Sequence, residues 1–395
     1  MSETNYNILL QSDVKLYFRL FIIGLIICLS GCREPFDPQI NEKTNAITVD
    51  GSLIKGRKKQ VVTITRSAPL YNIEYIPVTG CQVKIMDEFE NIFTFNEESE
   101  GRYTAEISDN LLVTNRRYKL VFDTPDGNNY ESAFEELIET APVDSVYTAS
   151  ESIYSSSDQK YINVVQFYLD LKAPEEGARY YRWDLTETYE VHSFYHIDWI
   201  YLNRDTLYPS NPDSVYYCWV TSDIDELFSS NTVNLRINEK KKIPLNYVPR
   251  NSRKLAVRYS LLVKQYALSP DDYDYWHQKK VEIEESGGLY TKQPGQSKSN
   301  VVNVNDANEK ILGYFWASSL SQKRIYNDIP STFYRAANYC DTAEFDTSLV
   351  VPGIIVYVTT RLTSYGIDYT ADRVCFDCTL LGGSVEKPSF WDEGN

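Results

Sequence analysis

The side chains with the clearest chemical potential are cysteines, and Cys375 and Cys378 are separated by only two residues. Such a pair can act as a redox couple, supply half of a zinc site or form disulfides with other cysteines. A redox pair needs a helix N-terminus in a βαβ context, which the neighbouring residues do not indicate. A zinc site needs a second pair of ligands, and only Cys340 offers itself. We therefore expect no metal site, but a disulfide from Cys340 to Cys375 or Cys378.

A second chemically distinctive cysteine, Cys32, follows an apolar run from Leu20 to Leu29 and the small pair Ser30-Gly31. The run is preceded by Lys15 and Arg19 and is shorter than the roughly 20 residues that span a bilayer. A positive flank, a short apolar segment and small residues are the layout of a secretory signal peptide. With a cysteine directly after them, we expect cleavage before Cys32 and acylation of its thiol and new amine, an effectively permanent anchor.

This layout divides the start of the chain into a signal peptide at 1–31 and a tether at 32–43 with two prolines and mixed charges. Removing Cys28 with the signal and Cys32 with its lipid leaves five of the seven cysteines in an oxidising compartment. Five is odd, so at least one thiol is free or paired outside the chain. Cys81 alternates with Val83 and Ile85, which predicts that it points into a core.

The charge of the chain excludes some partners. With 39 basic and 55 acidic residues the formal net charge is −16. An acidic body is repelled by phosphate backbones and anionic headgroups, so we expect no nucleic-acid partner and no peripheral binding to lipid. A hydrophobic content of 43% is enough for buried cores.

The elements that must position these residues are mostly strands. Short β-branched or alternating stretches fill 44–140, which predicts a small β-sandwich. This segment resembles the Ig- or transthyretin-like sandwiches. Residues near 141–145 form the hinge, and clean period-two alternation beyond them predicts a larger antiparallel β-rich domain at 142–395. Ser269-Pro270-Asp271-Asp272 is a helix start, so one helix is expected near 270–285. The fold class is therefore mainly β, with one or two helices.

Catalytic chemistry is weakly indicated. The chain has no G-x-S-x-G nucleophile motif and no Gly-rich phosphate loop. His192 and His196 fall in a strand pattern that separates them by about 13 Å, which favours exposed and uninvolved side chains over metal ligands. We expect no enzyme and no cofactor.

Aromatic density is the best indication of binding. Twelve aromatic residues lie in the 40 residues from Tyr180 to Trp219. Tyr181, Trp183 and Tyr189 occupy the apolar face of a strand and belong to a core. The others occur among Asp, Asn, Pro and Ser, as in exposed loops or a long hairpin, and could stack a ligand, dock on a partner or pack between strand and loop. These candidates are Tyr195, Trp199, Tyr201, Tyr208, Tyr217 and Trp219.

Motifs along nearly the whole chain make it similar to a family of Bacteroidota lipoproteins defined by a domain of unknown function (DUF4249). They are Pro35-Phe36-Asp37-Pro38, Val49-Asp50-Gly51, Leu268-Ser269-Pro270, Trp276, Gly288-Leu289-Tyr290, Gln293-Pro294, Gly313-Tyr314-Phe315, Cys375-Phe376-Asp377-Cys378, Gly382-Gly383 and Lys387-Pro388-Ser389-Phe390-Trp391. The terminal block is the most specific part.

The resemblance implies a lipid-anchored outer-membrane protein, exposed at the cell surface, that accompanies a TonB-dependent transporter in nutrient uptake. It assigns no catalytic residue. As an accessory of this kind the protein would bind a ligand or cap the transporter, and glycan, peptide, siderophore and metal complex are all compatible with the aromatic residues. A structural or adhesive surface protein and an envelope hydrolase are the alternatives.

Overall fold

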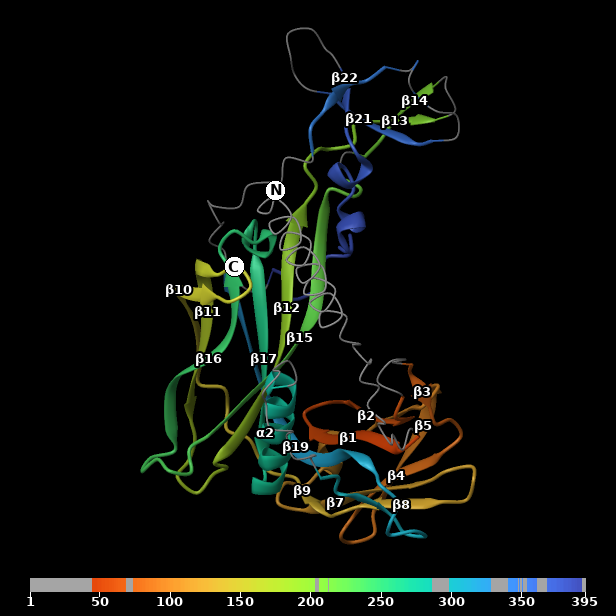
Figure 1. The fold of residues 1–395 in the computed structure, drawn as a ribbon, viewed down its shortest axis with the longest axis vertical. Coiled ribbons are helices and arrows are strands. Elements are labelled where there is room, and N and C mark those ends of the chain that lie inside the picture. Colours follow the sequence, from red (N-terminus) through yellow and green to blue (C-terminus); the bar gives the residue numbers. More distant parts are fainter. Residues whose placement is uncertain are drawn as a thin grey trace, which may run out of the picture. The chain divides into compact units, whose positions relative to one another are not determined.

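The computed structural model describes residues 45–392 except 69–73, 203–205, 212, 286–297, 328–339, 347, 349, 351–353 and 361–367 (Figure 1). The signal, Cys32, the tether and the motif at 288–294 lie outside the described residues. Within the described ranges, no helix combines the length and the apolar character that a membrane span requires. The architecture is mainly β, as the alternation of residue types predicts.

The first part of the chain forms a sandwich around an apolar core. Neighbouring strands follow the order β1-β2-β6-β5-β4-β7-β8, so that β1, β2 and β6 share one core with β4, β7 and β8. Alternate residues point inward, as in β4, where Val83 and Ile85 are buried and Lys84 is not. The elements are β1 (Ile47–Lys55), β2 (Lys59–Arg66), β3 (Ile76–Pro77), β4 (Gln82–Asp87), β5 (Ile92–Ser99), β6 (Arg102–Glu106), η1 (Asp109–Leu111), β7 (Arg117–Asp123), β8 (Asn129–Ser132) and β9 (Glu135–Glu136).

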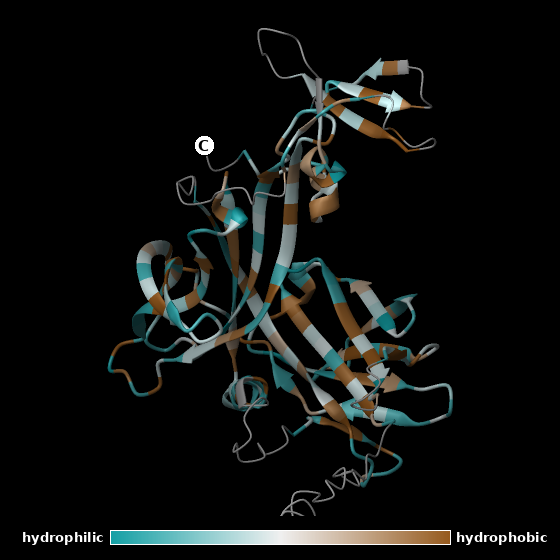
Figure 2. Ribbon diagram, turned by 45° about the horizontal axis from the view of Figure 1, so that its top comes forward, coloured by the Kyte–Doolittle hydropathy of each residue, from teal (hydrophilic) through white to brown (hydrophobic). Residues whose placement is uncertain are grey.

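A second sandwich follows, with long strands whose hydrophobic and hydrophilic residues alternate (Figure 2). The sheet β15-β12-β17-β19 and the sheet β10-β11-β16 share a second core, in which Tyr181 and Trp183 are buried as expected. The elements are β10 (Ser145–Ser155), β11 (Lys160–Lys172), β12 (Tyr180–His192), β15 (Tyr217–Asn231), β16 (Glu239–Pro249), η2 (Arg253–Leu255), β17 (Tyr259–Leu268) and β19 (Leu312–Asn327), and between the last two strands β18 (Val301–Asn303) extends the first sandwich.

Strand β19 joins the two sandwiches. It pairs antiparallel with β17 and parallel with β1, while β18 pairs with β8. At Gly313 (φ 86°) a Cβ atom would lie 1.8 Å from the carbonyl oxygen of Val49, so only glycine permits this approach. The expected ranges 44–140 and 142–395 therefore share sheets, because the chain returns to the first sandwich after residue 300.

Helix α2 (Pro270–Glu285) occupies the range that its start signal predicts. The Ser269 hydroxyl accepts a hydrogen bond from the Asp272 amide at 3.0 Å, and the Asp272 carboxylate accepts one from the Ser269 amide at 3.2 Å. This reciprocal cap fixes the first turn. Tyr275 then packs in parallel on Tyr314 of β19, with ring centroids 4.3 Å apart.

A small third sheet has the strand order β14-β13-β21-β22-β20. Its core is a cluster of Ile197, Cys340, Cys375 and Phe376. The elements are β13 (Trp199–Leu202), β14 (Thr206–Pro209), β20 (Ala343–Glu344), β21 (Val356–Thr360) and β22 (Asp368–Thr370), followed by η4 (Arg373–Cys375) and η5 (Cys378–Leu381). We call this sheet and its cluster the small sheet.

Candidate functional site

The six aromatic candidates lie on the small sheet and on the first residues of β15. Trp199 and Tyr201 are on β13, and Tyr208 is on β14, which forms a hairpin with β13. Tyr195 precedes the hairpin, while Tyr217 and Trp219 begin β15. The hairpin is the arrangement that the mixture of aromatic and polar residues predicts.

Two of the six serve the core of the small sheet. Tyr201 is 3% exposed, and its ring meets that of Phe345 edge-on at 5.3 Å. The Tyr195 hydroxyl donates to the carbonyl oxygen of Cys340 at 2.6 Å, and its ring packs on Phe376 at 5.6 Å. These two residues hold the sheet together and present little surface to a ligand.

Trp199, Tyr208 and Tyr217 are the exposed members, at 37%, 49% and 37%. Tyr208 is paired with Ile200, the neighbour of Trp199, so Tyr208 and Trp199 point to opposite faces of the hairpin. The structure therefore offers separate aromatic contact points and does not gather the six residues into one patch. Trp219 is half-buried, with its backbone paired to Ser384.

Tyr217 belongs to a cluster of rings and histidines. Its ring meets those of His192 and Tyr216 edge-on, each at 4.8 Å. His196 stacks on Tyr216 at 3.7 Å, and its Nδ1 lies 3.3 Å from a carboxylate oxygen of Asp213. The two histidines are therefore packed among rings and carboxylates, and the expectation that they take no part in metal binding or catalysis stays a prediction.

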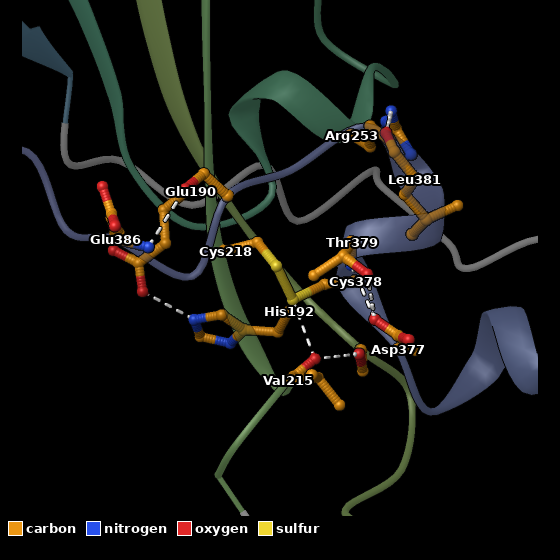
Figure 3. The surroundings of a disulfide bond; sticks show 12 residues. Glu190, His192, Val215, Cys218, Arg253, Asp377, Cys378, Thr379, Leu381 and Glu386 are labelled. Carbon is orange, nitrogen blue, oxygen red and sulfur yellow. Dashed lines mark hydrogen bonds and ion pairs between the residues drawn. A yellow bond between two sulfur atoms is a disulfide. The ribbon is translucent and has the colours of Figure 1, made fainter.

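His192 is fixed by an acid on its own strand (Figure 3). Its Nε2 lies 2.7 Å from Glu190, whose other oxygen accepts a hydrogen bond from the Trp391 indole at 3.0 Å. Burial raises the pKa of Glu190, but these hydrogen bonds outweigh it and lower the pKa below its usual value. The pair ties the chain end to β12 and positions Tyr217 beside it.

Of the two disulfides among the described residues, Cys340–Cys375 lies in the core of the small sheet, and Cys218–Cys378 lies in the core of the second sandwich. Cys340 pairs with Cys375, one of the two partners that the sequence leaves open for it. Cys378 pairs with Cys218 of β15 (Figure 3), a bridge that the sequence does not indicate. A Cβ atom at Gly383 would lie 2.5 Å from the Cβ of Cys218, so the Gly-Gly step lets the backbone pass the bridge. Cys81 is the free thiol of the described region and is buried.

The same residues bear on metal binding and acid chemistry. Among the described residues, no group of three or more His, Cys, Asp and Glu side chains is placed to hold a metal ion. Within that same region, His192 faces one carboxylate, that of Glu190, and His277 stacks in parallel with Tyr273 at 5.8 Å. The predictions of no metal, no cofactor and no catalysis stay predictions.

The family model described as "Domain of unknown function (DUF4249)" matches residues 33–324, which is most of the chain. The chain belongs to this family. Its motifs at Val49-Asp50-Gly51 and Gly313-Tyr314-Phe315 are the paired segments of β1 and β19, so this part of the family pattern encodes the joint between the sandwiches.

Comparison with curated proteins finds no match. Among solved structures, the chain is similar to a crystal structure of trypsin-activated alpha-2-macroglobulin from Escherichia coli, at 7% identity and a TM-score of 0.18. The likeness covers 58% of this chain and 15% of that one, so the chain spans a small part of its length.

Proposed function

We propose that this protein is a lipid-anchored outer-membrane protein, exposed at the cell surface, that binds a ligand or caps a TonB-dependent transporter during nutrient uptake. The anchor is Cys32, and residues 33–43 are the tether. The observation that carries the proposal is the small sheet: its core contains the disulfide Cys340–Cys375, and its β13–β14 hairpin exposes the Trp199 and Tyr208 side chains on its two faces. Disulfides persist in oxidising compartments, which fits an exported protein.

The physical logic is local concentration. A lipid at Cys32 confines the protein to the membrane that also holds the transporter, so that capture and handover become effectively intramolecular. Aromatic side chains exposed on a rigid sheet are suited to such a contact because they bury large apolar area at little cost in side-chain entropy. The first sandwich acts as a spacer in this proposal.

Anchoring and partnership are tested together in the native cell. Mass spectrometry should find the Cys32 thiol and amine acylated and residues 1–31 absent. Mild detergent extraction of the tagged protein should co-purify a β-barrel transporter, and Cys32→Ser should release the protein from the membrane. A bare thiol, or extraction without a transporter, contradicts the proposal.

The contact surface is tested with matched aromatic variants. Trp199→Ala combined with Tyr208→Ala should reduce recovery of the transporter without changing the amount of folded protein. Tyr161→Ala is the control, because Tyr161 is 73% exposed but lies on β11 in the second sandwich. If the double variant and the Tyr161→Ala control reduce the recovery of the transporter equally, or if neither reduces it, the contact lies elsewhere on the protein. An intact uptake phenotype in a deletion strain would instead support a structural or adhesive role.

A further inference from the structure

A cavity of about 390 Å³ opens in the second sandwich, away from the small sheet, where residues of β12, β15 and β16 come together with η2. Its wall combines Tyr247 and the apolar side chains of Ile224, Val248 and Pro249 with five polar residues, Glu187, Glu226, Asn246, Ser252 and Lys254. Its size is that of a small-molecule site, and its lining is more polar than that of most such sites.

The floor of the cavity is a buried carboxylate. Glu187 is 4% exposed, although it occupies the face of β12 that otherwise carries Tyr181, Trp183, Leu185, Tyr189 and Val191. One of its oxygens accepts from Ser222 at 3.2 Å and from the Lys254 ammonium group. The other accepts from the buried Tyr259 hydroxyl at 2.9 Å. A charge in an otherwise apolar layer is costly to bury, and here it is held by three donors.

Two irregularities in the strands shape the walls. On β16, Leu245 and Asn246 together lie opposite the single residue Phe167, which makes a β-bulge. On β15, residues 225–227 lie opposite the single residue Asp184. Bulges bend a strand and redirect its side chains, and here each one contributes a polar residue to the cavity, Asn246 and Glu226.

Asn246 supplies an unused hydrogen-bond acceptor. Its side-chain amide nitrogen donates to Tyr259 at 3.4 Å, but its Oδ1 atom is buried and has no partner in the described part of the chain. The residue is 7% exposed and lines the cavity. A buried acceptor without a donor is unfavourable, so a ligand that brings an O–H or N–H group to this atom gains a hydrogen bond that the protein lacks.

From this arrangement we infer that the cavity binds a small neutral polyhydroxylated molecule, a monosaccharide or disaccharide. Glu187 and Lys254 neutralise each other on the floor, and Glu226 adds one carboxylate to the wall, where it can accept hydrogen bonds from hydroxyl groups. Asn246 Oδ1 accepts, the remaining hydrogens of the Lys254 ammonium group donate, and hydroxyl groups can do both. At the rim Tyr247, 46% exposed, presents an aromatic ring for the C–H face of a sugar ring.

This inference stands apart from the proposed function, because it concerns another face of the molecule and needs neither a lipid anchor nor a transporter. The discriminating features are the Asn246 acceptor that lacks a donor and the Lys254 cation that is already paired with Glu187. A free amino acid would bring a carboxylate into a lining that already holds two carboxylates, Glu187 and Glu226, and a single cation.

The experiment is saturation-transfer NMR on the protein as purified from its native cell, in a detergent without a sugar headgroup. The probes are glucose, galactose, mannose, N-acetylglucosamine, maltose and cellobiose, with arginine and glutamate as charged comparators. We expect saturable binding of at least one sugar and none of the amino acids. Sugars that give no saturable signal at tens of millimolar, or stronger binding of an amino acid, overturn the inference.

Two variants place the binding in the cavity. Tyr247→Ala changes an exposed side chain, so the fold should persist, and affinity for the bound sugar should fall by about tenfold or more. Asn246→Ala removes the acceptor and should have a comparable effect, with folding followed by circular dichroism. Tyr161→Ala is again the matched control and should leave affinity unchanged. Binding that survives Tyr247→Ala unaltered places the sugar elsewhere and overturns the inference.

Discussion

The first sandwich and the small sheet are stabilised in different ways. The core of the first sandwich comprises 22 buried apolar residues, among them the unpaired Cys81, and no disulfide touches it in the described part of the chain. The small sheet buries four such residues, and two of these, Cys340 and Cys375, form a disulfide. A small core gives little stability, and a covalent bridge compensates for it. We therefore expect burial of apolar side chains to provide most of the stability of the first sandwich, and disulfide cross-links to provide most of that of the small sheet.

Removing the bridge Cys218–Cys378 should have the largest effect. Its ends are 160 residues apart, and in the chain-entropy model closing such a loop stabilises by about 5 kcal/mol. We expect Cys218→Ala with Cys378→Ala to lower the free energy of unfolding by that order, measured by urea titration with near-ultraviolet circular dichroism. A loss confined to the first sandwich would contradict the comparison, since neither cysteine lies in its core.

Removing Cys340–Cys375 should cost slightly less. The separation of 35 residues corresponds to about 4 kcal/mol in the same model. The effect should be local, so Cys340→Ala with Cys375→Ala should expose the β13–β14 hairpin to limited proteolysis while the first sandwich stays resistant. Cys81→Ala is the control, because it removes a thiol that forms no bridge. Equal sensitivity in the two variants would show that the bridge does not hold the small sheet.

Truncating a side chain in the apolar core tests whether burial stabilises the first sandwich. Leu120 of β7 is fully buried in the first sandwich. Leu120→Ala should destabilise by about 3 kcal/mol, because it removes buried methyl groups and leaves a cavity. Leu111→Ala is the matched control, since Leu111 is 53% exposed. A reducing agent should not destabilise the first sandwich of Leu120→Ala any further. A further loss of stability there would show that disulfides also stabilise the first sandwich, which would contradict the comparison.

Local signals in the sequence predict local structure well in this protein. The cap at Ser269 gives the start of α2, and period-two alternation gives the buried face of β12 with Trp183. Pairings between segments that are distant in the sequence have no such signal. Strand β1 lies beside β19, and Cys218 is bonded to Cys378, but the spacing of residues in the sequence predicts neither pairing.

The aromatic candidates illustrate the same limit. Composition places them in a hairpin, but whether a ring is buried depends on strand partners from another part of the chain, such as the Phe345 ring against Tyr201. The floor of the cavity was accessible to sequence reasoning. Glu187 is an acid on the apolar face of an alternating strand, and a charge at such a position indicates a special role.

The last prediction concerns a buried acid of the first sandwich, Glu135 on β9. Burial, reinforced by the nearby Asp272 carboxylate of α2, raises the pKa of Glu135 on β9 from 4.5 to about 7. Between these two values the folded protein binds more protons than the unfolded chain, so this group lowers stability as the pH rises from 4.5 to 7. Above that window the full penalty applies, and below it the penalty is absent.

Glu135→Gln should therefore stabilise the protein by the order of 2 kcal/mol at pH 8 and leave it unchanged at pH 4. The Asn300 amide, which donates to Glu135 Oε1 at 2.7 Å, can donate equally to a glutamine oxygen. Glu136→Gln is the control, because Glu136 is the exposed neighbour on the same strand. Urea midpoints across this pH range measure both variants. If the gain is the same at pH 4 and pH 8, ionisation of Glu135 is not its cause.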